Sequence, residues 1–396
     1  MIPHARLDAV TEADLRALID HGVRESRTLD YKRDWPAGRD ARAELAKDVC
    51  AFANSLGGDL VFGMREEGGA AAEIVPLQYA NLDADLLALT SALRDLLEPR
   101  VSGGLHAHPV PLAAGGHVIV LRVAPSPAAP HRVTRDNHFY ARTSVGKEPM
   151  DIHGIRHAFA AGTALGQHIR EFRDDALTRI ERREIPVAEF AGPACVCHVV
   201  PVSAFSRQDA HGVDALVAAG EKLRSVRGAN AFVMSRPRVN LDGVVCVPHP
   251  NESTRGYVQL HRNGAVELVY ADLLFHSPLD DPGGQSLLPE LYEKPLVHGG
   301  LPAIVETLAA LDVAPPAYLM LSWLVGPVTR IAVERPYNRA DFIALPAHLG
   351  RISAPPIYLE DFSADPLTVL GPAFDVLWNA VGVAHTQTDF AAADPD

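Results

Sequence analysis

The sequence predicts an α+β protein with two domains. The chain has 396 residues, whereas a single domain usually holds about 100–200. Hydrophobic residues make up 47% and charged residues 21% of the chain, proportions typical of a protein with packed cores. Segments with the apolar spacing of helices alternate with short β-rich segments along the whole length. We therefore expect a mixed sheet with flanking helices in the first domain, followed by a second, α/β-type domain.

Composition and charge predict where the domains begin and end. We expect the first domain at residues 1–160 and the second at 185–396. Between them, residues 161–184 are highly charged and are expected to form a connecting helix.

The first domain begins with a helix at 12–21, which Thr11 can cap. A second helix is expected at 40–54, because apolar residues recur at helical spacing from Leu45 to Phe52. The later elements of this domain are expected as strands at 59–64, 105–112, 117–123 and 137–143, and as helices at 82–97 and after Met150.

Residues 28–32 predict a short strand between the first two helices. Successive side chains of a strand point to opposite faces. Leu29 and Tyr31 share one face, which we expect to be core, and Asp30 and Lys32 share the other, which we expect to be exposed.

The second domain also mixes strands and helices. Asn263-Gly264 between two apolar segments is a strong signal for a two-residue hairpin turn. The elements expected here are strands at 194–202, 244–247, 256–262, 265–269 and 317–325, and helices at 213–225 and 300–312.

Several classes of protein are disfavoured. No apolar run approaches the ~20 residues of a membrane span, and no signal peptide is evident at the N-terminus. Four cysteines are too few for a disulfide framework, so a cytoplasmic protein is expected. Cys195 and Cys197 lack zinc-site spacing and are interpreted as buried structural cysteines in a strand. No serine lies in a G-x-S-x-G motif, so no hydrolase triad is predicted.

The net charge of −13 argues against a protein covered in basic charge. The charge is uneven: residues 1–160 hold 18 basic and 21 acidic residues, whereas residues 161–396 hold 18 and 28. A polyanion site is therefore expected in the first domain. Most basic residues are arginines, which suit bidentate phosphate contacts but also follow from a GC-rich genome.

A basic segment lies between residues 122 and 147. It holds five basic residues against one acid, Asp136. Arginines interleaved with aromatic residues can bind phosphates and stack on bases, although an ordinary solvated sheet edge has the same composition. The residues that we assign to nucleic-acid binding are Arg33, Arg132, Arg135, Tyr140, Arg142 and Lys147.

Asp30 and Lys32 give the sharpest chemical signal. A carboxylate and an ammonium side by side on a strand can hold a divalent metal ion and a phosphate oxygen together. Glu25 precedes this strand and Glu66 follows the next one, so three carboxylates converge if the two strands are neighbours. Oxygen ligands of this kind suit Mg²⁺ or Mn²⁺. The alternative is a solvated ion pair, because D-x-K is common by chance.

Two motifs of the first domain resemble a known family, the Schlafen AlbA-like domain. Glu25-Ser26 followed by Asp30-Tyr31-Lys32 is similar to the family's E-S-x-x-x-E-F-K. Residues 51–63, A-F-A-N-S-L-G-G-D-L-V-F-G, are similar to its A-F-A-N-T-x-G-G-x-x-x-x-G. The resemblance covers about residues 12–160 and extends to H-F-Y-A-R-T-S at 138–144.

The resemblance implies a function for the first domain. Such domains are associated with nucleic-acid binding, and in animal Schlafens the fold carries a metal-dependent site that cleaves transfer and ribosomal RNA. Carried over by position, the catalytic and metal-binding acids fall on Glu25, Asp30 and Glu66, and the catalytic lysine falls on Lys32. Asp30 replaces the usual Glu, Glu66 the usual Asp and Tyr31 the usual Phe.

Gly57, Gly58 and Gly63 invite comparison with a phosphate-binding loop. They lack the G-K-[ST] of such a loop and precede a strand rather than a helix. We interpret them as a helix stop with a close backbone approach, and we expect no ATP hydrolysis.

The leading hypothesis is a prokaryotic metal-dependent endonuclease that cleaves RNA, such as transfer RNA or another structured RNA, in a stress or anti-phage response. The first alternative is a non-catalytic module that binds DNA, RNA or a nucleotide. The second is a degenerate scaffold whose second domain is the active part. RNA is favoured over DNA as the partner, no membrane partner is expected, and a homo-oligomer is compatible with the sequence. For the second domain, sensing, oligomerisation and substrate selection stay open.

Overall fold

In the computed structural model the chain divides into two compact units, Met1–His168 with Ala314–Pro316, and Ile169–Val313 with Ala317–Asp396. The division falls inside one helix, α4 (Ile152–Glu181), where the sequence predicted a helix after Met150 and a separate connecting helix. The structure describes residues 2, 7–101, 104–143, 146–187, 192–205, 211–227, 234–248, 255–271, 273–276, 285–326, 329–335, 339–346 and 348–391. Ser144, the last residue of the H-F-Y-A-R-T-S motif, lies outside them.

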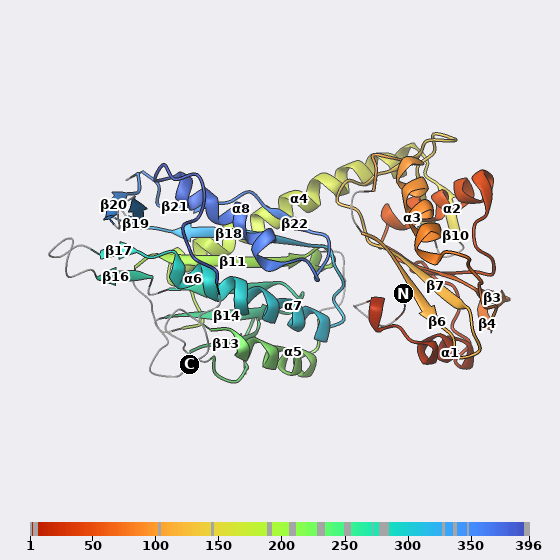
Figure 1. The fold of residues 1–396 in the computed structure, drawn as a ribbon, viewed down its shortest axis with the longest axis horizontal. Coiled ribbons are helices and arrows are strands. Elements are labelled where there is room, and N and C mark those ends of the chain that lie inside the picture. Colours follow the sequence, from red (N-terminus) through yellow and green to blue (C-terminus); the bar gives the residue numbers. More distant parts are fainter. Residues whose placement is uncertain are drawn as a thin grey trace. The chain divides into compact units, whose positions relative to one another are not determined.

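The first unit is built on a four-stranded mixed sheet in the order β1-β2-β7-β6 (Figure 1). β1 runs parallel to β2, and the other neighbours are antiparallel. The strands are β1 (Leu29–Lys32), β2 (Gly58–Phe62), β6 (Leu105–Pro111) and β7 (His117–Val123).

Helices cover both faces of this sheet. α2 (Gly38–Ala53) and α3 (Leu82–Asp95) pack with the strands in one apolar core. α1 (Glu12–Asp20) packs with them in a second core, on the other side of the sheet in Figure 1. Asp30 therefore lies under a covering layer and is only 4% exposed, which corrects the expectation that its face of the strand is open to solvent.

Three pairs of short strands complete the first unit. They extend the unit around the ends of the main sheet and carry several of the basic residues. The pairs are β3 (Met64–Glu67) with β4 (Ala70–Ile74), β5 (Leu97–Glu98) with β8 (Arg132–Val133), and β9 (Tyr140–Thr143) with β10 (Gly146–Pro149).

The paired glycines lie where backbone segments approach closely. Gly57 has a φ of +71°, and a Cβ there would lie 2.6 Å from the carbonyl oxygen of Val123. A Cβ on Gly58 would overlap the ring of Phe52. Side chains therefore do not fit at either position, which confirms the close backbone approach predicted from the sequence.

The asparagine of the A-F-A-N motif ties α2 to the basic segment. The side-chain amide of Asn54 donates to the carbonyl oxygens of His131, at 2.8 Å, and Tyr140, at 2.9 Å. Its own oxygen accepts from the backbone N–H of His131 at 2.6 Å. Since a buried backbone group without a partner is costly, this one side chain holds two distant segments in place.

The second unit is built on an eight-stranded antiparallel sheet. The strand order is β12-β13-β14-β15-β11-β18-β21, with β22 also paired to β18. This differs from the parallel sheet that an α/β-type domain would have, although the α+β class of the chain is confirmed. The strands are β11 (Ala194–Pro201), β12 (Arg238–Val239), β13 (Gly243–Cys246), β14 (Gly256–His261), β15 (Val266–Tyr270), β18 (Ala317–Leu324), β21 (Arg351–Ser353) and β22 (Ile357–Leu359).

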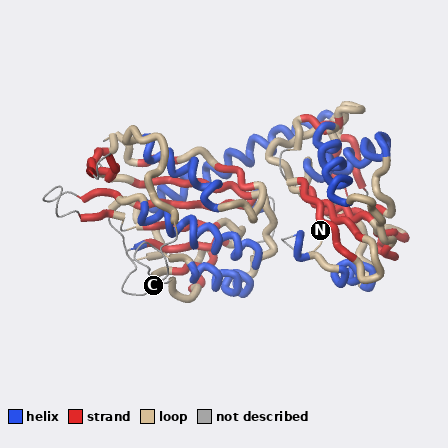
Figure 2. Tube along the Cα trace, in the orientation of Figure 1, coloured by secondary structure: helices blue, strands red, loops and turns tan. Residues whose placement is uncertain are grey.

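Helices also cover this larger sheet on both faces. The end of α4 packs on one face through Leu177 and Ile180. Figure 2 shows the other helices lying along the strands. They are α5 (Val213–Gly220), α6 (Glu290–Pro295), α7 (Leu301–Ala310) and α8 (Pro366–Asn379). A smaller sheet joins β16 (Leu274–His276), β17 (Gln285–Leu287), β19 (Arg330–Arg335) and β20 (Arg339–Ala344).

Two local predictions for this unit are confirmed. β14 and β15 form the expected hairpin around Asn263-Gly264. Cys195 and Cys197 are buried on β11 as free thiols. In the described part of the chain, no helix is long and apolar enough to cross a membrane.

Candidate functional site

Asp30 lies at the centre of a group of charged side chains on β1. The Lys32 ammonium donates to both oxygens of the Asp30 carboxylate at 3.1 Å. The Arg142 guanidinium, from β9, donates to Oδ2 of Asp30 at 3.0 Å. Two cations therefore occupy the carboxylate that the sequence assigned to a metal ion.

α2 adds a second buried carboxylate, Asp48. The Lys147 ammonium donates to Oδ2 of Asp48 at 2.9 Å, and Lys32 Nζ lies 3.6 Å from the same oxygen. Arg142 Nη1 lies 3.7 Å from Oδ1 of Asp48. We call Asp30, Asp48, Lys32, Arg142 and Lys147 the charge cluster. Lys147 also lies 2.9 Å from Oε1 of Glu44, so carboxylates balance the three cations of the cluster.

Arg142 belongs to the interior of the unit. Its side chain is only 5% exposed. Its guanidinium lies 4.6 Å from the centre of the Phe52 ring and donates to the carbonyl oxygen of Ser26 at 3.2 Å. Arg142 therefore joins β9 to α2 and β1, and its burial differs from the exposed phosphate contact that the sequence predicts.

Burial and neighbouring charges shift the pKa values of this cluster. For Asp30, burial raises the pKa, but the hydrogen bond from Glu25 and the charges of Lys32 and Arg142 outweigh it, so the pKa is lowered. For Lys32, burial lowers the pKa, and the carboxylates of Asp48 and Asp30 more than offset this. For Asp48, burial dominates and raises the pKa. Asp30 is therefore held as a carboxylate facing ammonium and guanidinium groups.

Glu25 forms a carboxyl pair with Asp30. Burial, followed by the hydrogen bond to Asp30, raises the pKa of Glu25 to about 7. Oε1 of Glu25 also accepts from the backbone N–H of Tyr31 at 2.9 Å. Two carboxyl groups this close cannot both ionise easily, so Glu25 carries the proton below about pH 7 while Asp30 carries the charge.

Glu66 is placed differently from these two acids. It lies on β3 as an exposed residue, and its Oε2 accepts from the backbone N–H of Gly69 at 2.5 Å. Among the described residues, no group of three His, Cys, Asp or Glu side chains could hold a metal ion. Among the described residues the structure thus brings Glu25 and Asp30 together but not the full trio, and a bound Mg²⁺ or Mn²⁺ stays a prediction of the sequence.

The remaining residues assigned to nucleic-acid binding fall into three situations. Arg33 is exposed and forms no ion pair or hydrogen bond with the described part of the chain. Arg132 is paired with Glu98, and Arg135 lies 2.7 Å from Asp40. Of these residues, Arg33 is thus the one most available to a ligand.

Tyr140 is buried, with 8% of the residue exposed. Its hydroxyl donates to Asp136 at 2.8 Å. A ring in this position has no open face for a nucleic-acid base, in contrast to the stacking role that the sequence predicts.

Sequence reasoning missed Asp48 and Arg27. Asp48 lies on a helix face that the apolar spacing of α2 marks as core, so an acid facing inward there was the available signal. Arg27 precedes β1, is exposed and has no partner among the described residues. The signal available in the sequence was that Arg27 and Arg33 flank the same short strand.

Replacing Glu25 with glutamine is expected to change how stability depends on pH. A carboxyl whose pKa is raised by folding stabilises the native state below its unfolded pKa, and this contribution is lost as pH rises through about 7. Glutamine does not ionise, so E25Q should become more stable than wild type as pH rises from ~5 to ~8, by on the order of 1 kcal/mol because Glu25 is half-exposed. Thermal unfolding at both pH values measures this. E73Q, at an exposed carboxyl of the same unit, is the control, and an E25Q difference that stays constant with pH would contradict the pairing.

Part of the first unit is similar to a known protein family. The family model described as Schlafen, AlbA_2 matches residues 25–151. The crystal structure of the DIP2311 protein from Corynebacterium diphtheriae is 18% identical with a TM-score of 0.26, and the match covers 35% of this chain and 30% of that one. The solution structure of the N-terminal domain of a Nitrosomonas europaea protein related to the ATP-dependent DNA helicase RecG is 20% identical with a TM-score of 0.24, covering 29% and 74%. No curated protein matches the chain.

The segment that the family model matches contains the charge cluster. The matched segment begins at Glu25 and contains the whole charge cluster. It also contains Asn54 and the paired glycines, whose packing roles are described above. Residues 25–151 are therefore a Schlafen AlbA_2 domain.

Proposed function

We propose that the Schlafen AlbA_2 domain binds nucleic acid through its phosphates, along β1. The observation that carries the proposal is the pair of exposed arginines at the two ends of this strand. Arg27 and Arg33 have no carboxylate partner among the described residues. Lys32, between them, is paired with Asp30 and Asp48. Most other cations near the site are also paired with acids, so the two arginines are the side chains free to contact a phosphate.

The position of β1 in the sheet also favours phosphate binding along this strand. It is an edge strand, with β2 as its neighbour on one side. The charge cluster holds Asp30 neutralised beneath it. A phosphate backbone that follows the edge would meet the arginine side chains while Asp30 beneath it is already neutralised.

Binding is tested by fluorescence anisotropy with labelled RNA and DNA strands over a range of salt concentrations. We expect the affinity of the wild type to fall steeply as salt rises, because bound counterions are released. R27Q and R33Q should each weaken binding about threefold to tenfold and reduce the salt slope by about one. R100Q, at an exposed arginine of the same unit paired with Asp95, is the matched control. Wild-type affinity in both variants would place binding elsewhere.

Metal-dependent cleavage of RNA is a second candidate. The Glu25–Asp30 carboxyl pair beside Lys32 favours it, because paired carboxyls and a lysine are suited to phosphodiester chemistry. The separate position of Glu66 weighs against a metal held by all three acids. Incubation with total RNA and Mn²⁺, with and without chelator, beside D30N tests it. Cleavage that persists in D30N would remove Asp30 from the site, and the absence of any cleavage would leave binding alone.

The preference for RNA over DNA, a stress or anti-phage role and self-association stay predictions of the sequence. The anisotropy measurement compares RNA with DNA directly. Sedimentation of the purified chain tests self-association.

A further inference from the structure

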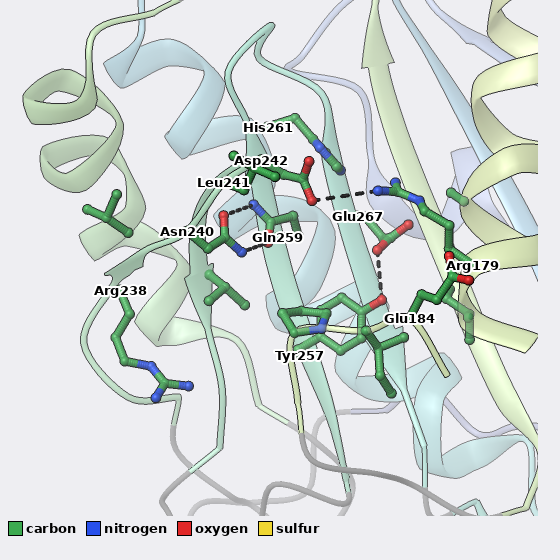
Figure 3. Close-up of a pocket in the computed structure, with 16 residues that line it drawn as sticks. Arg179, Glu184, Arg238, Asn240, Leu241, Asp242, Tyr257, Gln259, His261 and Glu267 are labelled. Carbon is green, nitrogen blue, oxygen red and sulfur yellow. Dashed lines mark hydrogen bonds and ion pairs between the residues drawn. The ribbon is translucent and has the colours of Figure 1, made fainter. Parts of the chain in front are cut away.

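A cavity of about 410 Å³ opens on the second unit, beside the face of the large sheet that α4 covers. β14 and β15 form its floor, α4 forms one wall, and the turn between β12 and β13 forms its rim (Figure 3). Its size falls in the ordinary range of small-molecule sites, about 300–1,000 Å³. None of the residues assigned to the Schlafen AlbA_2 site contributes to it.

The floor of this cavity carries a buried carboxylate. Glu267 accepts from the hydroxyl of Tyr257 at 2.8 Å and lies 2.9 Å from Nε2 of His198. Burial raises the pKa of Glu267, but the hydrogen bond and charge of His198 outweigh it and hold the pKa at about 2. The groups at the floor that could donate to an anion, the Tyr257 hydroxyl and Nε2 of His198, are therefore already bound to Glu267.

His261 adds an unused hydrogen-bonding group. The residue is only 8% exposed, and its Nε2 has no hydrogen-bond partner although it lines the cavity. Leaving such a buried group unpaired destabilises the fold. Burial, the largest influence, lowers the pKa of His261, so the ring is neutral and its Nε2 suits a neutral polar group of a ligand.

A weak ion pair lies across the entrance. Arg179 Nη1, from α4, is 3.6 Å from Oδ2 of Asp242, and both side chains are close to half-exposed. Exposed pairs of this kind contribute little stability. An anionic ligand can therefore displace Asp242 from Arg179 at low cost, and a guanidinium binds phosphate in a bidentate manner.

The rest of the lining combines apolar residues and one amide pair with two charged residues, Glu184 and Arg238. Ile180, Ile185 and Val245 line the walls. Asn240 and Gln259 bond to each other through their amides, at 2.6 and 3.2 Å, and Figure 3 shows them side by side. Apolar walls with a few hydrogen-bonding groups fit a flat heteroaromatic ring, whose faces are apolar and whose edge is polar.

From this arrangement we propose that the cavity binds a nucleoside monophosphate. The phosphate binds Arg179 at the entrance in place of Asp242. The base lies between the apolar walls, and a neutral polar group of the nucleoside hydrogen-bonds to Nε2 of His261. The phosphate stays at the entrance because Tyr257 and His198 at the floor are already bound to Glu267. The second unit would then act as a sensor of small nucleotides.

Calorimetry on the full chain with AMP, GMP, CMP and UMP tests the proposal, with adenosine and inorganic phosphate as partial ligands. At least one nucleotide is expected to bind, and both partial ligands to bind at least tenfold more weakly. R179Q should weaken the nucleotide at least tenfold, whereas D242N should tighten it about threefold because it removes the competing carboxylate. A gain in D242N cannot arise from misfolding. R224Q, at an exposed arginine of the same unit outside the cavity, should bind as wild type does.

A further variant, at the floor of the cavity, distinguishes a loss of binding from a loss of folding. H261F keeps a ring in place and removes the unpaired nitrogen, so binding should be lost while the melting temperature is kept or raised. The proposal is overturned if none of the four nucleotides binds, or if inorganic phosphate binds as well as they do. It is also overturned if binding is unchanged in R179Q and D242N. Binding that is lost in R33Q instead would assign the nucleotide to the first unit and equally overturn it.

Discussion

Replacing Asp59 with alanine is expected to lower the free energy of unfolding of the first unit by about 3–5 kcal/mol. Asp59 is fully buried on β2, and the Arg122 guanidinium on β7 donates to its two oxygens at 2.8 and 3.0 Å. The backbone N–H of Ile2 donates to the same carboxylate at 2.7 Å. D59A would leave the Arg122 charge buried without a partner and would release the start of the chain.

Urea denaturation, with hydrogen exchange to localise the effect to the first unit, measures this loss. D95A removes an exposed carboxylate, 3.0 Å from Arg100, and is expected to cost less than about 1 kcal/mol. The double variant D59A/R122L should be more stable than D59A, because neither charge stays buried. D59A with the stability of D95A would show that the buried pair does not support the fold.

Replacing Arg142 with glutamine is expected to cost about 3–5 kcal/mol of folding stability as well. The sequence assigned Arg142 to phosphate binding, whereas in the structure its buried guanidinium neutralises Asp30 and Asp48. R142Q removes the guanidinium that faces both buried carboxylates and also removes the contact with the Phe52 ring. A structural role for Arg142 predicts that R142Q lowers stability, whereas a phosphate contact predicts that it weakens RNA binding.

Parallel measurements of unfolding and of RNA binding distinguish the two roles. R135Q is the control, since Arg135 is about half-exposed and its pair with Asp40 is expected to contribute less than about 1 kcal/mol. Adding D30N to R142Q should recover part of the lost stability, because it removes a buried carboxylate that has lost one of its two cationic partners. R142Q that unfolds like wild type but binds RNA poorly would support the phosphate contact instead.

Glu66 is placed apart from the carboxyl pair that Glu25 forms with Asp30. In the sequence, the three acids stand at the positions where the family carries its own. The β3–β4 hairpin holds Glu66 against Gly69 through a local hydrogen bond. A motif specifies which residues are present, whereas the hairpin geometry decides where their side chains point.

Local patterns in the sequence were sufficient for the elements and for the family. The apolar spacing of α2, the strand at β1 and the Asn263-Gly264 turn each depend on residues close together in the chain, and all are present in the structure. The A-F-A-N and G-G motifs likewise reflect packing demands near one helix end. These features depend on short-range backbone geometry and side-chain size, which can be inferred from neighbouring residues in the sequence.

Burial and charge compensation were decided only by the tertiary structure. Whether Asp30 is exposed depends on α2 covering its face, and its partner Arg142 lies 112 positions later. The antiparallel order of the large sheet and the cavity lined by Arg179, His261 and Glu267 likewise join distant segments. Coulomb energy and desolvation depend on distances in space rather than along the chain, so the sequence identifies the acidic and basic residues while the fold determines which of them neutralise one another and which stay free to bind a ligand.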